Sequence, residues 1–271
     1  MKCISASLIF ILYFTYSFAQ VPDSTQQLFA DLNNLSWSAV DTTLNNPDWE
    51  KHWRVDGYRA DIKETNSGLL FCAGPVAFDN GSHAVMWTKE SFSGAIKIEF
   101  DYTRVDDISR FVNIIYIQAT GIGTEPYAED IHQWDSLRTV PTMSKYFRNM
   151  NAYHISFAAF GVKNDDPDFD YVRARRYPVP PQGNFSKDTA LQPDYFRTGL
   201  FQPGTCYRMT IIKKDNHLIL QVSNNDTEKF FYWNTSAFPA IESGKVGIRH
   251  MYTRCALYEN FTISSLQQRK R

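Results

Sequence analysis

The chain has 271 residues, of which 43% are hydrophobic and 15% aromatic, and its formal net charge is −1. This length and hydrophobic share are enough to bury one sizeable core. A balanced charge gives no field that draws the protein to nucleic acid or to an anionic membrane, so the composition argues against both as partners.

The first residues have the pattern of a secretory signal peptide. Lys2 supplies a short positive start, residues 4–18 carry no charge, and Ser17-Phe18-Ala19 before Gln20 fits a cleavage site. The run is short for a membrane span, although a retained N-terminal anchor stays open. We therefore expect residues 1–19 to be removed and residues 20–271 to form a single domain. The mature protein is expected to be periplasmic or extracellular, without stable membrane insertion.

Three cysteines follow the expected cleavage point, at Cys72, Cys206 and Cys255. An odd number allows at most one disulfide and leaves one thiol free. Their spacing matches neither a disulfide framework nor a Cys-x-x-Cys metal pair. We expect all three to be small core residues, and whether two of them pair is left open.

Strand patterns dominate from Trp37 onward, after a short helix or irregular segment at 26–35. Residues 96–102 alternate apolar and polar side chains, as strands with one buried face do. Residues 111–119 are an almost continuous β-branched and aromatic run, typical of a strand covered on both faces. Asp215-Asn216 separates two further runs and predicts a hairpin. The remaining strands are expected at 153–160, 230–233, 246–252 and 256–263. Many strands without βαβ alternation predict a sandwich or barrel.

Two stretches interrupt this pattern, at residues 121–148 and 164–184. We expect both to be long loops at the rim of the sheets. Loops of this length in a compact β domain are more often functional than not, so they are expected to border a binding face.

Four groups of residues occur in order along the chain. They are His83-Ala-Val-Met-Trp87-Thr-Lys with Ile98-Glu-Phe100-Asp; Ala119-Thr-Gly121 with Glu129-Asp130-Ile131; Asn151-Ala-Tyr153-His154-Ile-Ser156; and Gly247-Ile-Arg249-His250-Met251 with Tyr258-Glu-Asn260-Phe261. Together they resemble the YesU-like family of the concanavalin A-like lectin/glucanase superfamily. The likeness implies a jelly-roll β-sandwich of two antiparallel sheets. It also implies a place among polysaccharide-degradation proteins, near oligosaccharide dehydratases that act on uronic-acid ends, as in ulvan breakdown.

The implied reaction removes water from a terminal uronic acid by β-elimination. It needs a base for the C5 proton, an acid for the departing 4-hydroxyl and a cation at the carboxylate. His154 is the candidate base, because strand alternation places it with Ser156 on the more polar face, opposite Tyr153. A hydrogen-bonded structural histidine is the alternative. Arg249 is the candidate carboxylate clamp, with an internal Glu as the alternative partner. His83 is a candidate proton donor.

Other residues are candidates for binding the substrate. They are Asp130 and His132 in one loop, Trp134 and Trp87 as sugar platforms, Ser156, Arg175 and His250. Core packing is the favoured alternative for Trp87, and strand alternation points His250 away from Arg249. Arg175 forms a group with Arg173 and Arg176. We expect this group to bind sulfate or carboxylate groups, or else to be a basic strip exposed to solvent. No cofactor or metal is expected. A Ca²⁺ site is the minor alternative, because the acidic run lacks the spacing and glycine of an EF-hand loop; the run is Asp165, Asp166, Asp168 and Asp170.

Three functions remain open. The preferred one is a lyase-type enzyme, a dehydratase that eliminates water from the non-reducing-end uronic acid of acidic, ulvan-like oligosaccharides to give an unsaturated uronate. The alternatives are a non-catalytic carbohydrate-binding protein and a glycoside hydrolase of a polysaccharide-degradation system. The hydrolase ranks lower because the paired-carboxylate strand of jelly-roll glucanases is absent, and Glu99 and Asp101 are expected on the solvent side of their strand.

Overall fold

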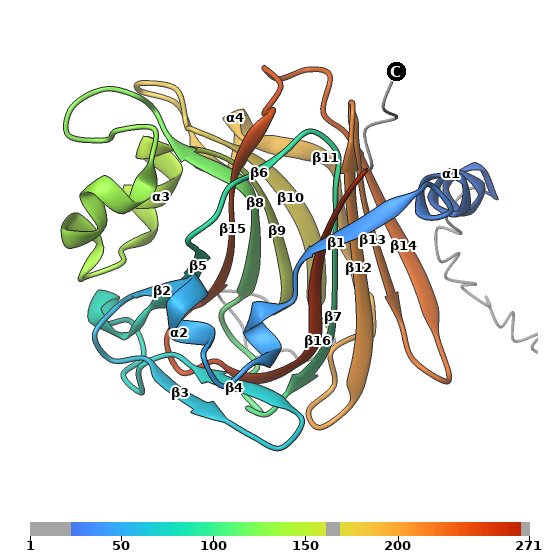
Figure 1. Ribbon diagram of the computed structural model, residues 1–271, viewed down its shortest axis with the longest axis horizontal. Helices are drawn as coiled ribbons and strands as arrows, with labels where there is room; N and C mark the ends of the chain where they lie inside the picture. The colour runs from blue at the N-terminus through green and yellow to red at the C-terminus, as the bar shows by residue number, and fades with distance from the viewer. Residues whose placement is uncertain (1–22, 161–168, 267–271) are drawn as a thin grey trace, which may run out of the picture.

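The computed structural model describes residues 23–160 and 169–266, which form two antiparallel sheets packed face to face (Figure 1). Sheet A contains, in spatial order, β14 (Glu228–Asn234), β13 (His217–Ser223), β12 (Cys206–Lys214), β7 (Ile96–Arg104), β16 (Cys255–Leu266), β4 (Gly68–Cys72) and β3 (Asp61–Glu64), and β1 (Trp37–Asp41) pairs with β16. Sheet B contains β11 (Ala190–Phe196), β10 (Asp170–Tyr177), β9 (Met150–Phe160), β8 (Asn113–Gly121), β15 (Ser243–His250), β5 (Ala84–Thr88) and β2 (Trp53–Asp56), and β6 (Phe92–Ser93) pairs with β15. The predicted all-β sandwich is confirmed.

The strand patterns of the sequence explain the core between the sheets. Along β7, buried side chains alternate with half-buried ones, and Ile98 and Phe100 belong to the main hydrophobic cluster. Nearly every residue of β8 is buried, because this central strand of sheet B is covered on both faces. The hairpin predicted at Asp215-Asn216 joins β12 to β13 in register.

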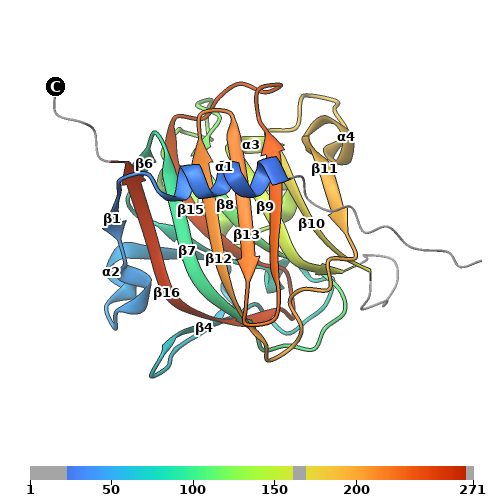
Figure 2. The same cartoon turned by 90° about the vertical axis from the view of Figure 1, so that its right-hand side faces the viewer.

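Short helices pack around the sandwich. They are α1 (Asp23–Asn33), η1 (Thr43–Asn45), α2 (Trp49–His52), η2 (Asn80–Ser82), η3 (Ile131–Arg138), α3 (Met143–Asn149) and α4 (Phe185–Asp188). Helix α1 crosses the outer face of sheet A, where Phe29 and Leu32 pack on β12 and β13 (Figure 2). Helices η3 and α3 lie over one end of the outer face of sheet B, the face turned away from sheet A (Figure 1).

Both predicted long loops contain regular structure. Residues 121–148 include η3 and most of α3, and residues 164–184 include all of β10, so the second prediction is wrong for that segment. The three arginines of β10 obscured its strand pattern. Arg175 and Arg176 are nevertheless 2% and 5% exposed, so a solvated basic strip is also wrong for these two residues.

The cysteines depart from the expected core role. Cys72 and Cys255 face each other across β4 and β16 and form a disulfide, whereas Cys206 is a free, exposed thiol. The predicted limit of one bridge is confirmed, and the assignment of all three to the core is wrong. The expected signal peptide, residues 1–19, lies outside the described residues. Within the described ranges, no helix is long and apolar enough to cross a membrane.

Candidate functional site

The outer face of sheet B carries a row of functional side chains on neighbouring strands. In β9, Tyr153 points into the core between the sheets, and His154 points to the outer face, as the alternation predicts. His154 lies directly opposite Tyr116 of β8 on one side and Arg175 of β10 on the other. Gly247 of β15 stands opposite Tyr116 and continues the row toward β5.

The alternation of β9 ends at a bulge. Ala158 has a φ of +45° and packs between the sheets, and Ala159 packs on the outer face. This reverses the faces that a regular strand gives these two residues, but His154 and Ser156, which precede the bulge, keep their expected side.

Aromatic rings fill the part of this face that lies beneath α3. Trp87 stacks on Tyr116, with ring centroids 5.1 Å apart, and on Tyr146 of α3 at 6.3 Å. A Cβ atom added to Gly247 would lie 2.5 Å from the Trp87 ring, so only glycine lets that ring lie against β15. Trp87 is fully buried, which confirms core packing for it and leaves no free ring face for a sugar.

Asp56 of β2 holds this aromatic layer to η3. Its Oδ2 atom accepts hydrogen bonds from Trp87 Nε1 at 2.8 Å, Tyr146 Oη at 2.9 Å and Arg138 Nε at 2.6 Å. Burial raises the pKa of the Asp56 carboxyl, and the adjacent Arg138 opposes that rise. The Asp56–Arg138 ion pair is buried and internally satisfied, so we assign it a structural role.

Arg249 has different surroundings although it is equally buried. Its Nη2 atom donates to the carbonyl of Pro141 at 2.5 Å, and its guanidinium lies 4.6 Å from the centroid of the Tyr146 ring. Its Nε and Nη1 atoms are buried and make no hydrogen bond. None of the ion pairs within residues 23–160 and 169–266 includes Arg249, so the alternative of an internal Glu partner is wrong there.

Two further buried polar groups lie near Arg249. The Nδ1 atom of His83 is buried without a hydrogen bond, and the buried hydroxyl of Tyr116 makes none of ordinary geometry, although it lies next to the Arg249 guanidinium and the Tyr177 hydroxyl. Burial, and then the charge of Arg249, lower the pKa of His83 to about 2. Burial raises the pKa of Tyr116, against the opposing effect of the same charge. Both residues are therefore uncharged near neutral pH, and each lies within electrostatic reach of the guanidinium. We name Arg249, His83 and Tyr116 the arginine site.

His154 has partners on both ring nitrogens. Nδ1 contacts the hydroxyl of Tyr177, and Nε2 contacts Ser156 Oγ at 2.5 Å. Burial, followed by the charge of Arg175, lowers the pKa of His154 well below its usual value. This geometry matches the alternative of a hydrogen-bonded structural histidine, because a base for a bound sugar needs a free nitrogen.

Arg175 is paired within the protein. Its Nη1 and Nη2 atoms donate to the two carboxylate oxygens of Asp194 at 2.9 and 3.2 Å. Arg173, two residues earlier on the same face, lies 3.8 Å from Asp194 as well. One carboxylate therefore serves two guanidinium groups.

The expected loop residues Asp130, His132 and Trp134 lie in and around η3. Asp130 accepts from the backbone N–H of His132 at 3.1 Å, and its carboxylate is 3.5 Å from Lys245 Nζ. His132 Nε2 is 3.2 Å from the carbonyl of Thr88, and Trp134 is 2% exposed. These contacts attach η3 to sheet B, and none of them reaches the arginine site.

His250 lies on the other side of β15 from Arg249, as expected. Its Nε2 contacts Tyr258 Oη at 2.8 Å, and its ring lies 4.5 Å from that of Phe71 between the sheets. Burial, and then the charge of Arg254, lower its pKa to about 3. The structure therefore separates His250 from the other predicted site residues.

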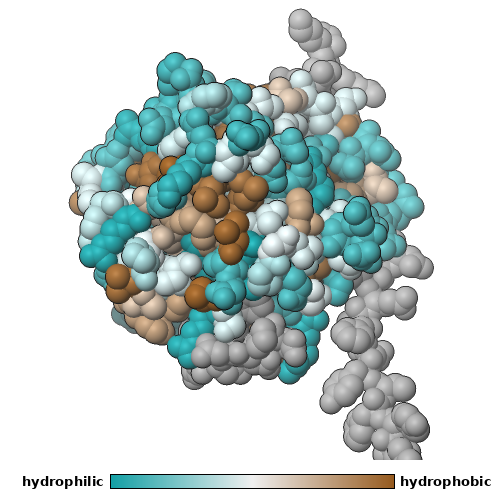
Figure 3. All heavy atoms as spheres, turned by 90° about the horizontal axis from the view of Figure 1, so that it is seen from below, coloured by the Kyte–Doolittle hydropathy of each residue, from teal (hydrophilic) through white to brown (hydrophobic). Residues whose placement is uncertain are grey.

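Aromatic residues lie next to the arginine site at one end of the sandwich. The Tyr252 ring lies 4.5 Å from that of His83 in a tilted arrangement and meets the Phe111 ring edge-to-face at 4.4 Å. Phe78, 64% exposed, packs against both Tyr252 and Phe111. Figure 3 looks onto the end seen from below in Figure 1, where hydrophobic residues gather within a hydrophilic surround.

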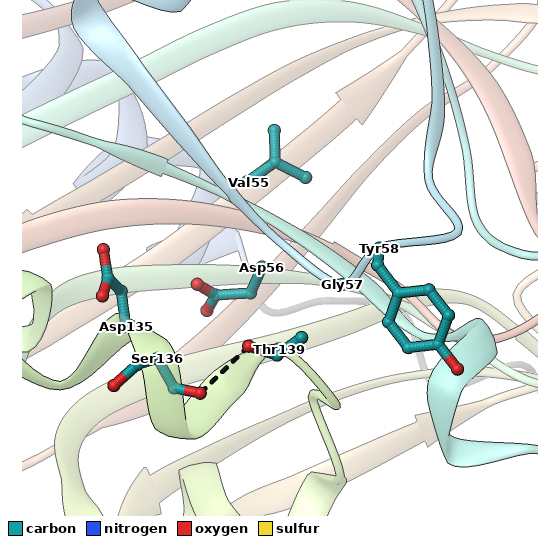
Figure 4. Close-up of a pocket in the computed structure, with 7 residues that line it drawn as sticks. All are labelled: Val55, Asp56, Gly57, Tyr58, Asp135, Ser136 and Thr139. Atoms are coloured by element: carbon teal, nitrogen blue, oxygen red, sulfur yellow. Dashed lines mark hydrogen bonds between the residues drawn. The ribbon is translucent and has the colours of Figure 1, made fainter.

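A pocket of about 270 Å³ opens between the end of β2 and η3 (Figure 4). Residues 55–58 form one side, and Asp135, Ser136 and Thr139 form the other. No group of three or more potential metal ligands occurs among residues 23–160 and 169–266. Of the acidic run considered for Ca²⁺, only Asp170 falls among the described residues, and its carboxylate accepts from Thr198.

The sequence analysis missed Asp56, Tyr116, Tyr146 and Tyr177. Tyr116 had a local signal, since it occupies the same face of β8 as Ile114 in a run predicted to be a strand. The other three reach the site only through contacts distant in sequence, such as the 90-residue separation between Asp56 and Tyr146.

Solved structures share this fold. The chain aligns with a Bacillus subtilis protein of unknown function with a galectin-like fold at a TM-score of 0.58 and 20% identity, over 85% of this chain and 100% of that one. It aligns with a legume lectin-like domain from Entamoeba histolytica at 0.53 and 9%, over 85% and 100%. It aligns with the Ca²⁺/Man3GlcNAc-bound VIP36 exoplasmic/lumenal domain at 0.54 and 7%, over 85% and 92%.

No protein-family model matches the sequence, and no curated protein matches it either. The resemblance to the YesU-like family therefore stays a prediction, as does the dehydratase activity that it implies. The structural alignments, each at 20% identity or less, establish the fold alone. The chain has the two-sheet jelly roll of galectin-like and legume lectin-like proteins.

Proposed function

We propose that this protein binds carbohydrate, and that the arginine site holds the carboxylate of an acidic sugar. The observation that carries the proposal is Arg249, a fully buried guanidinium with two unpartnered donors and no carboxylate in reach among the described residues. An unpaired buried charge costs several kcal/mol, so such a residue is rarely retained without a ligand or partner. A carboxylate accepts charge-assisted hydrogen bonds from a guanidinium, and Nε and Nη1 are each free to donate one.

The neighbouring groups fit the remainder of a sugar. Tyr116 Oη and His83 Nδ1 are uncharged and make no hydrogen bond of ordinary geometry, so each can form one with a sugar hydroxyl. The rings of Phe78 and Tyr252 at the adjoining end offer apolar faces for pyranose C–H groups. The VIP36 domain, which has a similar fold, is described as bound to Man3GlcNAc, and this supports a saccharide as the ligand class.

Binding is tested by isothermal titration calorimetry of the wild-type protein with glucuronic acid and with glucose. The two sugars differ only at the carboxylate, so glucuronic acid is expected to bind at least about tenfold more tightly. Arg249→Met should abolish this difference. Arg208→Met, which removes a half-exposed arginine of sheet A, is the matched control and should retain it. Equal affinity of the wild type for both sugars would refute the proposal.

A second candidate function is the predicted dehydratase. The specific observation in its favour is that His83 has an unpartnered ring nitrogen beside a cation that could neutralise a uronate. In the reaction, a base removes the C5 proton, the C4–O bond breaks, and the 4-hydroxyl leaves as water after receiving a proton. In this geometry His83 presents a polar atom that a substrate could reach by hydrogen bonding, whereas both ring nitrogens of His154 are engaged.

The two candidates differ in what happens to the sugar. After incubation with an oligosaccharide that ends in a uronic acid, a dehydratase gives a product lighter by one water, with the ultraviolet absorbance of a conjugated unsaturated uronate. A binding protein returns the oligosaccharide unchanged. New reducing ends without unsaturation would instead indicate the glycoside hydrolase. We favour the binding protein, acting outside the cytoplasm if the N-terminal segment is a signal peptide.

A further inference from the structure

The pocket between β2 and η3 has a different chemical character from the arginine site. Its lining includes the carboxylates of Asp56 and Asp135, the hydroxyls of Ser136 and Thr139 and the residue Tyr58, and none of its lining residues is lysine or arginine. Figure 4 shows Asp56 and Tyr58 coming from the β2 side and the other three from the opposite side. Each carboxylate is paired with an arginine outside the lining, Asp56 with Arg138 and Asp135 with Arg54. The pocket therefore offers acceptors to hydroxyl groups and no free cation to an acidic sugar, which favours a neutral, hydroxyl-rich molecule.

The polar groups of this pocket are held in place. Asp135 forms an ion pair with Arg54, and the hydroxyl of Thr139 donates to the carbonyl of Ser136 at 3.0 Å. All three bonds to Asp56 reach its Oδ2 atom. Tyr58 is 60% exposed, so its ring presents an apolar face beside these acceptors.

The pocket shares a wall with the arginine site. Gly57 lines the pocket and has a φ of +96°, and a Cβ atom added to it would lie 2.4 Å from the His83 carbonyl oxygen and 3.2 Å from Pro141 Cγ. His83 belongs to the arginine site, and the Pro141 carbonyl accepts from Arg249. The backbones of Gly57 and His83 are therefore in contact, so the two sites are neighbours.

We propose that this pocket is a second sugar subsite, which takes the neutral sugar joined to the acidic sugar at Arg249. The proposal rests on the proposed function for the acidic residue. A volume of about 270 Å³ is near the lower end of ligand pockets, about 300–1,000 Å³, and so fits one monosaccharide rather than a longer chain. The protein then recognises an acidic sugar joined to a neutral one. The cation at Arg249 takes the acidic sugar and the pocket takes the neutral sugar, which fixes the orientation of the glycan.

The test compares glucuronic acid with the disaccharide in which glucuronic acid is joined to xylose. Wild-type protein is expected to bind the disaccharide at least about tenfold more tightly. Asp135→Ala removes a half-exposed acceptor of the pocket and should abolish that gain while leaving the affinity for glucuronic acid unchanged. Asp61→Ala is the matched control, because Asp61 also forms an exposed ion pair, with Lys63 on β3, and lies outside the pocket.

Each outcome separates the two proposals. Equal affinity of the wild type for the two sugars, or a gain that survives Asp135→Ala, overturns the subsite and leaves the acidic-sugar site intact. Xylose alone should shift the amide NMR signals of Ser136 and Thr139 in the wild type but not in Asp135→Ala. If those shifts are absent, the pocket is not a sugar subsite, whatever glucuronic acid does. Failure of glucuronic acid to bind, with the xylose shifts present, overturns only the proposed function.

Discussion

The guanidinium of Arg249 lies over the ring of Tyr146, 4.6 Å from its centroid, and this ring is the support that the arginine has instead of a carboxylate. A cation over an aromatic face gains about 0.5–2 kcal/mol, less than the cost of burying the charge. Tyr146 therefore orients Arg249 without neutralising it, and leaves Nε and Nη1 for an anion.

Replacing this arginine should not harm the fold. In Arg249→Met an unpaired buried charge gives way to an apolar side chain of similar length, so the free energy of unfolding should stay equal or rise. Arg138→Met is the matched control, because it leaves the buried Asp56 carboxylate without its ion-pair partner. It should lower the free energy of unfolding by about 3–5 kcal/mol. Urea unfolding of both variants measures the difference. Comparable destabilisation of the two would mean that Arg249 is satisfied internally.

The contact between Gly247 and Trp87 should tolerate no added atom. In Gly247→Ala the new methyl group would meet the indole ring at 2.5 Å, and overpacking of this kind costs about 1–3 kcal/mol. The ring is also stacked on Tyr116, so a displaced Trp87 should weaken sugar binding together with stability. Thermal unfolding and calorimetric titration of one preparation measure both effects. An unchanged melting temperature would show that the indole has room to move.

Acid should destabilise the protein through its buried histidines. The folded pKa values of His83 and His250 are about 2 and about 3, against 6.5 when unperturbed. Below about pH 6.5 the unfolded chain therefore binds more protons than the folded protein does. The stability that these two histidines contribute is present above that pH and is lost as the pH falls toward their folded pKa values.

The expected slope is about 1.4 kcal/mol per pH unit for each such histidine. Urea unfolding between about pH 7 and pH 5 measures this slope. His250→Gln should reduce it by the contribution of one histidine, about 1.4 kcal/mol per pH unit. A free energy of unfolding that is the same at both ends of this range would show that these histidines titrate normally in the folded protein.

Reduction of the Cys72–Cys255 disulfide should also lower stability. The bridge joins residues 183 apart in sequence, and closing a long loop in the unfolded chain contributes about 2–5 kcal/mol. The double variant Cys72→Ala/Cys255→Ala should unfold at a correspondingly lower urea concentration. Cys206→Ser, which changes the exposed free thiol, is the control and should unfold like the wild type. A loss of stability in Cys206→Ser alone would contradict this assignment.

Local sequence patterns were sufficient for the fold class and for the direction of side chains in regular strands. Period-two alternation in β7, the apolar run of β8 and the turn at Asp215-Asn216 each depend on neighbouring residues only. The same alternation correctly placed His154 and Tyr153 on opposite faces of β9, up to the bulge at Ala158.

Local patterns could not predict which residues distant in sequence contact each other in the fold. His154 contacts Tyr177 of the next strand, and Arg175 pairs with Asp194 of β11. The sequence predicts substrate contacts for both residues, but in the fold these polar groups already have partners within the protein. Arg249 and His83 have no such partner. What distinguishes these two residues is a buried nitrogen with no partner and no carboxylate beside it among the described residues, an arrangement in three dimensions that no spacing in the sequence encodes.

A crystal structure of the protein soaked with glucuronic acid tests the central claim most directly. We expect the sugar carboxylate to lie about 2.7–2.9 Å from Nε or Nη1 of Arg249, with a ring hydroxyl near Tyr116 or His83. A sugar bound elsewhere, or an Arg249 whose Nε and Nη1 pair with a carboxylate of the protein itself, would contradict the account.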